Sequence, residues 1–320
     1  MEVRQGLPAG GPPESFYLGL GNFDGVHRGH QHLISSIVQK ARAGGGMAVV
    51  ITFAPHPAQV LGGNTPGLLT TTARKIELIA ALGVDCLFIL PFTRELAAMA
   101  PATFVRDILW SRFHPRLVAV GFNFTFGYRG GGTPPLLRQL GEELGFQVEV
   151  MAPVTWQGLT VSSTAIRNAL GQGDIALARN LLGYWPVLTG TVVRGDQRGR
   201  QLGFPTANLA VPAAMKLPAY GVYASLARFS GQERQAVINI GRRPTFGPAL
   251  PATIEAHLLD FAGDLYGVEI TLELRAFLRP EKKFVSRLEL TRQLQEDITR
   301  AQLLLAGDDC LILQPRDRQA

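Results

Sequence analysis

Two histidines three residues apart stand where a predicted strand turns into a predicted helix. His27 and His30 close the segment 18–30, which begins in an apolar run and ends in a helical pattern. Backbone N–H groups and the helix dipole favour phosphate at such a helix start, and side chains three apart on a helix share a face. The pair could therefore point at one anion, with Gly29 giving that anion close access to the backbone.

The glycines of this segment argue against two common nucleotide sites. Gly19, Gly21 and Gly25 miss the GxGxxG dinucleotide fingerprint, because Asp24 stands where the third glycine belongs. The chain also lacks the Gly-Lys-Ser/Thr of a P-loop. Two bland alternatives stay open for the pair: ordinary core or surface histidines, and half of a zinc site, which no Cys or acidic ligand cluster accompanies.

A second constellation consists of three glycines at four-residue intervals with two arginines between them: Gly195, Gly199, Gly203, Arg198 and Arg200. Backbone amides and guanidinium groups in such a loop are suited to wrapping phosphate. A β-turn with solvated arginines has the same spacing, so the spacing alone leaves both possibilities open.

Neutral oxygens and one carboxylate follow this loop. Thr206 and Asn208 are two apart, so in an extended chain their side chains face the same way and could hold Mg²⁺ beside ATP; two ordinary turn residues are the alternative. The segment 253–258 alternates polar with apolar residues, which puts Glu255 on its polar face. Glu255 could accept the proton of an attacking hydroxyl, although a solvated strand carboxylate is the more common case.

The helices and strands that must position these residues follow two different patterns along the chain. Up to about residue 183, short apolar runs alternate with helical periods; the predicted strands are 16–20, 47–53, 84–90, 117–120 and 147–151. Strand and helix in alternation predict a doubly wound parallel sheet with helices on both faces. In such a sheet, ligands bind at the carboxyl ends of the strands.

After Trp185-Pro186 strand follows strand, at 187–193, 221–229, 235–240, 253–259 and 268–277, and a helical pattern at 286–305 comes last. Runs of short strands predict a β-barrel or sandwich, here closed by a C-terminal helix. We therefore expect two domains, 1–185 and 186–320.

Composition narrows the class of protein. The chain of 320 residues is 46% hydrophobic and 18% charged, which excludes disorder for most of it. We expect a cytoplasmic protein without a membrane partner, because no apolar run approaches the roughly 18 residues of a span and residues 1–15 carry no apolar leader. Cys86 and Cys310 lie far apart and are expected to be free thiols. The net charge of +6 suits anionic ligands.

The string 21–30, Gly-Asn-Phe-Asp-Gly-Val-His-Arg-Gly-His, resembles the flavin-adenylylating branch of the HxGH-type nucleotidyltransferases, the bacterial bifunctional riboflavin kinases/FMN adenylyltransferases or FAD synthetases. The segments 56–57, 121–127 and 162–167 match the same branch in order. In the second half, Pro-Thr-Ala-Asn at 205–208 matches its riboflavin kinase part unaltered. The resemblance covers about residues 16–305 and implies an α/β nucleotidyltransferase domain followed by a β-barrel kinase domain.

For the first domain, the resemblance implies that His27, His30 and Arg167 stabilise phosphate charge. ATP and FMN contacts are implied for Gly21, Asn22, Phe23, Asp24, Gly25, His56, Pro57, Asn123, Ser163 and Thr164. Asn123 stands where many relatives carry Asp. Ser163 and Thr164 are also expected to cap the helix that they open.

For the second domain, the resemblance assigns the catalytic base to Glu255 and Mg²⁺ to Thr206 and Asn208. ATP or flavin contacts are implied for Gly195, Gly199, Arg200, Gly203, Pro205, Thr206, Asn208 and Arg279. The implied activity is phosphorylation of riboflavin by ATP to FMN, then adenylylation of FMN by a second ATP to FAD. ATP is thus a co-substrate and Mg²⁺ the cofactor.

Two other functions compete with this interpretation. An adenylyltransferase for another phosphate acceptor, with the barrel as a docking module, would not need the kinase motif. A nucleic-acid-binding barrel would show aromatic residues interleaved with Lys and Arg on exposed strands, whereas the basic residues here gather in Gly-rich turns. We therefore expect small-molecule partners and no nucleic acid; the sequence does not indicate the oligomeric state.

Overall fold

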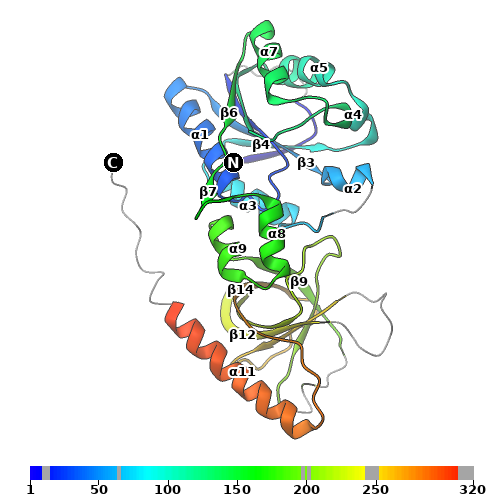
Figure 1. The fold of residues 1–320 in the computed structure, drawn as a ribbon, viewed down its shortest axis with the longest axis vertical. Coiled ribbons are helices and arrows are strands. Elements are labelled where there is room, and N and C mark those ends of the chain that lie inside the picture. The colour runs from blue at the N-terminus through cyan, green and yellow to red at the C-terminus, as the bar shows by residue number, and fades with distance from the viewer. Residues whose placement is uncertain (9–14, 63–65, 196–198, 200–202, 242–251, 309–320) are drawn as a thin grey trace. The chain divides into compact units, whose positions relative to one another are not determined.

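The computed structural model describes residues 1–8, 15–62, 66–195, 199, 203–241 and 252–308. They form two compact units, Met1–Ala165 and Ile166–Ala320. Figure 1 shows the open sheet of the first unit and the barrel of the second, with each unit built around its own sheet.

The first unit contains one six-stranded sheet made of β1 (Glu2–Gln5), β2 (Phe16–Leu20), β3 (Met47–Ala54), β4 (Cys86–Pro91), β5 (Pro115–Gly121) and β6 (Gln147–Met151). The strands lie in the order β1-β4-β3-β2-β5-β6, and every neighbouring pair is parallel. The five predicted strands are present, and the predicted fold class of this half is confirmed. All five residues of β2 are buried, as expected for a parallel strand covered on both faces.

The first strand, β1, was not predicted. All four of its residues are exposed, so no apolar alternation marks it in the sequence. It pairs with β4 at the edge of the sheet. A short polar edge strand depends on its partner for its conformation, and a sequence pattern cannot detect that partner.

The helical segments of this unit are α1 (Arg28–Gly44), α2 (Pro57–Leu61), α3 (Thr72–Ala80), α4 (Arg94–Ala98), α5 (Pro101–Thr103), the π-helix η1 (Phe104–Trp110), α6 (Ser111–Phe113), the 3-10 helix η2 (Tyr128–Gly130) and α7 (Pro134–Leu144). A short hairpin, β7 (Thr155–Trp156) with β8 (Leu159–Thr160), follows β6. Alternate strand residues feed two cores, one with α1 and α3 and the other with η1 and α7. Helices therefore cover both faces of the sheet, as predicted.

Gly19 lets α1 lie close on the sheet. A Cβ at this position would come within 3.0 Å of the Ile37 Cδ1 and 3.1 Å of the Leu33 Cδ2. Contacts this short force neighbouring side chains to move. The absence of a side chain on β2 thus fixes how near the sheet the helix with the His pair can lie.

The second unit contains α9 (Ile175–Leu182), β9 (Val187–Val193), β10 (Ala207–Ala210), β11 (Gly221–Phe229), β12 (Gln232–Gly241), β13 (Thr253–Leu258), β14 (Glu269–Pro280) and α11 (Arg287–Asp308). The six strands close into a barrel in the order β10-β13-β12-β11-β14-β9, with antiparallel neighbours. The barrel prediction is confirmed, and β10 is an additional strand. It carries Asn208, next to the predicted loop.

The long helix α11 packs on the outside of the barrel. Ala301 and Leu305 join a buried cluster with residues of β11, β12 and β14. Arg279 on β14 holds Asp297 on α11 with Nε at 3.0 Å and Nη2 at 2.8 Å from its oxygens. Neither α11 nor any other helix in the described ranges is long and apolar enough to cross a membrane.

Residues before the barrel also pack on it. α9 lies against β14, and the Ala219 N–H donates to the Leu170 carbonyl at 2.8 Å. The Trp185 ring lies 4.2 Å from the Arg179 guanidinium and 4.8 Å from that of Arg275. The second compact unit thus begins at Ile166, before the strand-rich stretch of sequence that starts with β9.

Candidate active sites

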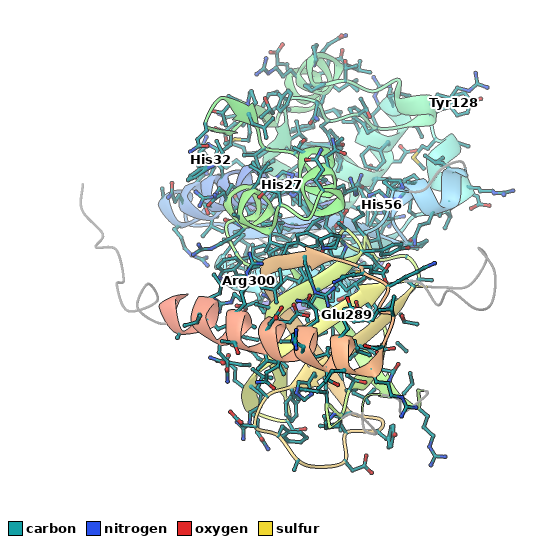
Figure 2. All side chains as sticks on the ribbon, turned by 60° about the horizontal axis from the view of Figure 1, so that its bottom comes forward. His27, His32, His56, Tyr128, Glu289 and Arg300 are labelled. Carbon is teal, nitrogen blue, oxygen red and sulfur yellow. The ribbon has the colours of Figure 1, made fainter. Side chains whose placement is uncertain are left out.

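The His pair lies at the start of α1, directly after β2. His27 is the N-cap residue, and its Nδ1 accepts the His30 N–H at 3.4 Å. The two rings stack with centroids 3.6 Å apart and an interplanar angle of 17°. Figure 2 labels His27, which is 6% exposed. The predicted juxtaposition of two imidazoles at a helix start, the position that favours a phosphate, is confirmed.

His30 is held in its neutral form. Its Nδ1 is buried without a hydrogen-bond partner, and the edge of the Phe23 ring packs on it with centroids 5.2 Å apart. Burial lowers the pKa of His30 well below its ordinary value, and the nearby His27 and Lys75 lower it further. A neutral imidazole still has one N–H to donate, so at pH 7 His30 can offer a hydrogen bond without carrying charge.

The turn from β2 to α1 is fastened by Asp24. This carboxylate is 3% exposed, and its Oδ1 accepts the N–H groups of Leu69 at 3.0 Å and Thr70 at 3.3 Å. The Gly25 N–H donates to the Thr70 Oγ1 at 3.1 Å. These contacts within the protein make Asp24 a support of the turn.

The other turn residues have distinct places. Gly21 donates its N–H to the Ile51 carbonyl at 3.2 Å, and a Cβ on it would meet the Phe23 ring at 3.2 Å. Phe23 is buried with φ of 47°, and Asn22 is exposed. The side chain of Asn22 is therefore the one in this turn that solvent reaches.

Helix α8 (Ser163–Gly171) corrects one prediction. The Ser162 Oγ accepts the Ala165 N–H at 3.2 Å, so Ser162, and not Ser163 or Thr164, caps the helix. The Ser163 Oγ donates to the Asp24 carbonyl at 2.9 Å, and Thr164 is exposed. Because an N-cap residue lies outside the helix, the first hydroxyl of the Ser-Ser-Thr run takes that place. Arg167, one turn further on, is half-buried and belongs to the second unit.

Two more predicted contacts follow neighbouring strands. His56 comes after β3 and caps α2, whose first residue is Pro57; its Nδ1 accepts the Ala58 N–H at 3.2 Å. Asn123 is exposed in the loop after β5. Since β3, β2 and β5 are adjacent and parallel, His56, the His pair and Asn123 all follow the carboxyl ends of neighbouring strands.

In the barrel, strand register brings predicted residues together. Asn208 on β10 lies directly opposite Glu255 on β13, and Asn239 on β12 lies opposite Glu255 on its other side. Directly opposed residues have Cβ atoms about 5 Å apart. The burial of β13 alternates as predicted, with half-buried Thr253, Glu255 and His257 on one face. A carboxylate flanked by two amides can accept a proton while they hold an anionic or polar ligand.

Two described glycines of the Gly-rich segment, Gly195 and Gly199, lie close to Asn208 and Thr206. A Cβ on Gly195 would overlap the Asn208 side chain. A Cβ on Gly199 would lie 3.3 Å from the Thr206 Oγ1, and the Gly199 carbonyl accepts the Phe204 N–H at 2.9 Å. Gly203 has a φ of 84°, a backbone conformation in which glycine is favoured. Arg200 lies outside the described residues.

Replacement of Gly195 by alanine should impair riboflavin phosphorylation. The new Cβ would push the Asn208 amide out of place, and a displacement of about 1 Å in a positioning group can lower the rate by about 10². We expect that loss in steady-state phosphorylation of riboflavin. Gly307→Ala is the matched control, since a Cβ there meets nothing within 4 Å. An unchanged rate in Gly195→Ala would show that the position of Asn208 is unimportant.

A cavity of about 600 Å³ lies beside this set. Its wall consists of Val192, Pro205, Thr206, Ala207, Ala256, Leu258 and residues 261–266. Thr206 borders it directly. Ala256 of β13 faces this cavity. Its neighbour Glu255 points away from the cavity, because successive side chains of a strand point to opposite faces. The loop 261–266 also lines this cavity, and no periodic pattern in the sequence marks it.

Arg279 is already paired. Its guanidinium is bound to Asp297, its Nη1 donates to the Pro280 carbonyl at 3.1 Å, and its side chain is 18% exposed. It lies in the same cross-strand row as Asn239, with Val222 between them. In this arrangement the guanidinium positions α11, and the predicted contact with ATP or flavin stays a prediction.

The donor set around Thr206 and Asn208 fits Mg²⁺. Among the described residues, no group of three or more His, Cys, Asp or Glu side chains could hold a metal ion. Mg²⁺ is a hard cation that takes oxygen ligands, and at phosphoryl-transfer sites it keeps several waters and binds substrate phosphates; the Thr206 hydroxyl and the Asn208 amide offer such oxygens. Gly195 lies so close to Asn208, and Gly199 to Thr206, that a side chain at either glycine would meet these donor residues. Cys86 is a free, buried thiol, as predicted, and Cys310 lies outside the described residues.

Comparisons with known proteins cover both units. The family model for FAD synthetase matches residues 12–165, and that for riboflavin kinase matches residues 182–305. The bifunctional riboflavin kinase/FMN adenylyltransferase of Escherichia coli K12 is 38% identical over 89% of this chain and 91% of its own. That of Bacillus subtilis 168 is 37% identical over 88% and 89%.

A solved structure from Streptococcus pneumoniae, described as a macrolide-efflux protein, has 29% identity and a TM-score of 0.85, covering 94% of this chain and 99% of that one. Identity of this extent over almost the full length of the relatives, together with two family models that match one after the other, identifies the family. The chain belongs to the bifunctional riboflavin kinases/FMN adenylyltransferases.

Proposed function

We propose that the barrel transfers the γ-phosphoryl group of ATP to the 5′-hydroxyl of riboflavin. Glu255 accepts the hydroxyl proton as the O–P bond forms and the bond to ADP breaks. Thr206 and Asn208 would hold Mg²⁺, which neutralises charge on the transferred phosphate. The position of Asn208 opposite Glu255 is the observation that carries this assignment, because phosphoryl transfer needs positioning and charge stabilisation above all.

The loop supports the same proposal. The amides of Gly195, Gly199 and Gly203 would surround the phosphates of ATP, with Arg200 and Pro205 beside them. Arg279 would contribute to flavin binding indirectly, by holding α11 in place through Asp297.

For the first unit we propose adenylyl transfer. A phosphate oxygen of FMN attacks the α-phosphorus of a second ATP, and pyrophosphate leaves. His27 and His30 donate hydrogen bonds to the phosphates at the start of α1, and Arg167 would neutralise the leaving pyrophosphate. Gly21, Asn22, Phe23, Asp24 and Gly25 form the turn that supports them. His56, Pro57, Asn123, Ser163 and Thr164 complete the proposed ATP and FMN contacts.

Because both steps consume ATP, we expect the enzyme to work in the cytoplasm.

Product analysis tests this function. The purified protein is mixed with riboflavin, ATP and Mg²⁺, and flavins are separated by chromatography. FMN followed by FAD is the expected result. An adenylyltransferase for a different acceptor would leave riboflavin unchanged, and unchanged riboflavin together with unchanged FMN would contradict both activities.

The domain boundary proposed near residue 185 can be tested by truncation. Fragments 166–320 and 186–320 both contain the six barrel strands, and we expect both to phosphorylate riboflavin. Fragment 186–320 should melt at a lower temperature, since it lacks α9, with buried Leu181 and Leu182, and Trp185 between its two arginines. Loss of two buried leucines costs several kcal/mol. Equal melting temperatures would show that α9 contributes nothing to the barrel.

A further inference from the structure

Lys75 is a buried cation that the proposed chemistry leaves without a role. It lies on α3 and is 7% exposed, on the same helix face as the buried Ile79. Burial of an ammonium group is costly unless hydrogen bonds compensate for it. A lysine in this place therefore needs a structural or functional reason.

Its hydrogen bonds lead to the first active site. Lys75 Nζ donates to the Asn22 carbonyl at 2.7 Å and to the Thr52 Oγ1 at 3.4 Å. The Thr52 Oγ1 donates to the same carbonyl at 3.0 Å. Asn22 follows the end of β2, and Thr52 lies near the end of β3. Lys75 thus fastens the carboxyl ends of two neighbouring strands, at the edge from which the His pair projects.

A buried carboxylate favours the charge on this lysine. Burial lowers the pKa of Lys75, and the nearby Asp24 opposes that shift. Asp24 holds the far side of the same turn through the N–H groups of Leu69 and Thr70. The segment between β2 and α1 is therefore held at Asn22 by a cation and at Asp24 by an anion.

We propose that Lys75 is a positioning residue for adenylyl transfer: its ammonium group fixes the Asn22 carbonyl and thereby the turn that delivers His27 and His30. This inference rests on the adenylyl-transfer function proposed for the first unit. Lys75 acts through the turn and through the buried imidazole.

The charge of Lys75 has a second effect, on His30. The ionisable groups that act on this imidazole are His27, stacked on it, and Lys75, with Asp24 beyond the lysine. Both neighbours lower the pKa of His30, after burial itself. Removal of the lysine charge should therefore raise the His30 pKa.

Two substitutions separate the hydrogen bond from the charge. Lys75→Met removes both, and Lys75→Gln keeps a donor for the Asn22 carbonyl without the charge. We expect kcat for FAD formation from FMN to fall on the order of 10- to 100-fold in Lys75→Met and to recover partly in Lys75→Gln. Riboflavin phosphorylation by the same full-length variants should stay at the wild-type rate. Lys40→Met is the matched control, since Lys40 lies exposed on α1 and pairs with Glu149.

The titration of His30, followed by NMR of labelled histidine, gives a readout independent of activity. Its midpoint should rise in both Lys75→Met and Lys75→Gln and stay unchanged in Lys40→Met. If the wild-type protein makes no FAD, the adenylyl-transfer function fails, while this titration still reports whether Lys75 acts on His30.

Three results would overturn the proposal: FAD formation in Lys75→Met within twofold of wild type, parallel loss of both activities, or an unmoved His30 midpoint in both variants. Should Lys75→Met fail to fold, Thr52→Val replaces it, because this change removes the other donor to the Asn22 carbonyl. A fall in FAD formation with unchanged phosphorylation then supports the proposal, and an unchanged rate of FAD formation contradicts it.

Discussion

Glu255→Gln should lower kcat for riboflavin phosphorylation by about 10²–10⁴, the usual contribution of a general base. The amide keeps the size and shape of the carboxylate opposite Asn208 but cannot take the proton of the 5′-hydroxyl. Riboflavin and ATP should bind nearly as tightly as before, because the proton moves only as the transition state is reached. The measurements are steady-state kinetics of phosphorylation and equilibrium binding of each substrate.

Two comparisons make this result specific. FAD formation from supplied FMN should continue in Glu255→Gln, since the phosphate nucleophile is already ionised at neutral pH. Glu269→Gln, on an exposed position of β14, should leave both activities within the small range of surface substitutions. Phosphorylation within a few-fold of wild type in Glu255→Gln would remove Glu255 from the mechanism.

His27→Ala and His30→Ala should each lower FAD formation from FMN by about 10²–10³, as is typical when one group that stabilises transition-state charge is lost. Riboflavin phosphorylation should stay close to wild type in both. The double variant should lose little more than either single one, since stacked rings at one helix start act as a unit. Kinetics of FAD and pyrophosphate release measure these effects.

The controls separate chemistry from helix stability. His27 caps α1, and loss of a cap costs roughly 1 kcal/mol. His27→Asn retains a good capping residue, so it should melt like wild type and still lose FAD formation. His32→Ala changes an exposed histidine on the same helix (Figure 2) and should be silent. Equal loss of both activities in folded variants would argue against separate sites.

Local patterns were sufficient for the fold class and for the places of the motifs. Buried strands such as β2 are apolar throughout, and the alternation at 253–258 correctly put Glu255 on the half-buried face of β13. The step from β2 to α1 is contiguous in the chain, so the position of His27 at the helix start followed from the sequence. Periodicity and helix capping are properties of neighbouring residues, which explains this success.

Other features depend on partners far along the chain. Asn208 meets Glu255 only because of the register between β10 and β13. Similarly, Gly195 is required by the Asn208 side chain that lies against it. A one-residue slip of register would turn every side chain to the other face, and no local pattern specifies this pairing.

The sequence by itself determined the family, the two kinds of sheet and the motif residues that stand at strand ends and helix starts. Only the tertiary structure decided what those residues touch. In the structure the guanidinium of Arg279 binds Asp297, and Ser162 caps α8. The Lys75 ammonium group donates to the Asn22 carbonyl. Lys75 reads in the sequence as one charged residue in a helical stretch. The structure shows that Lys75 is buried, and a buried ammonium group needs hydrogen bonds to offset the loss of water. Its partner is the carbonyl of Asn22, 53 residues away in the chain.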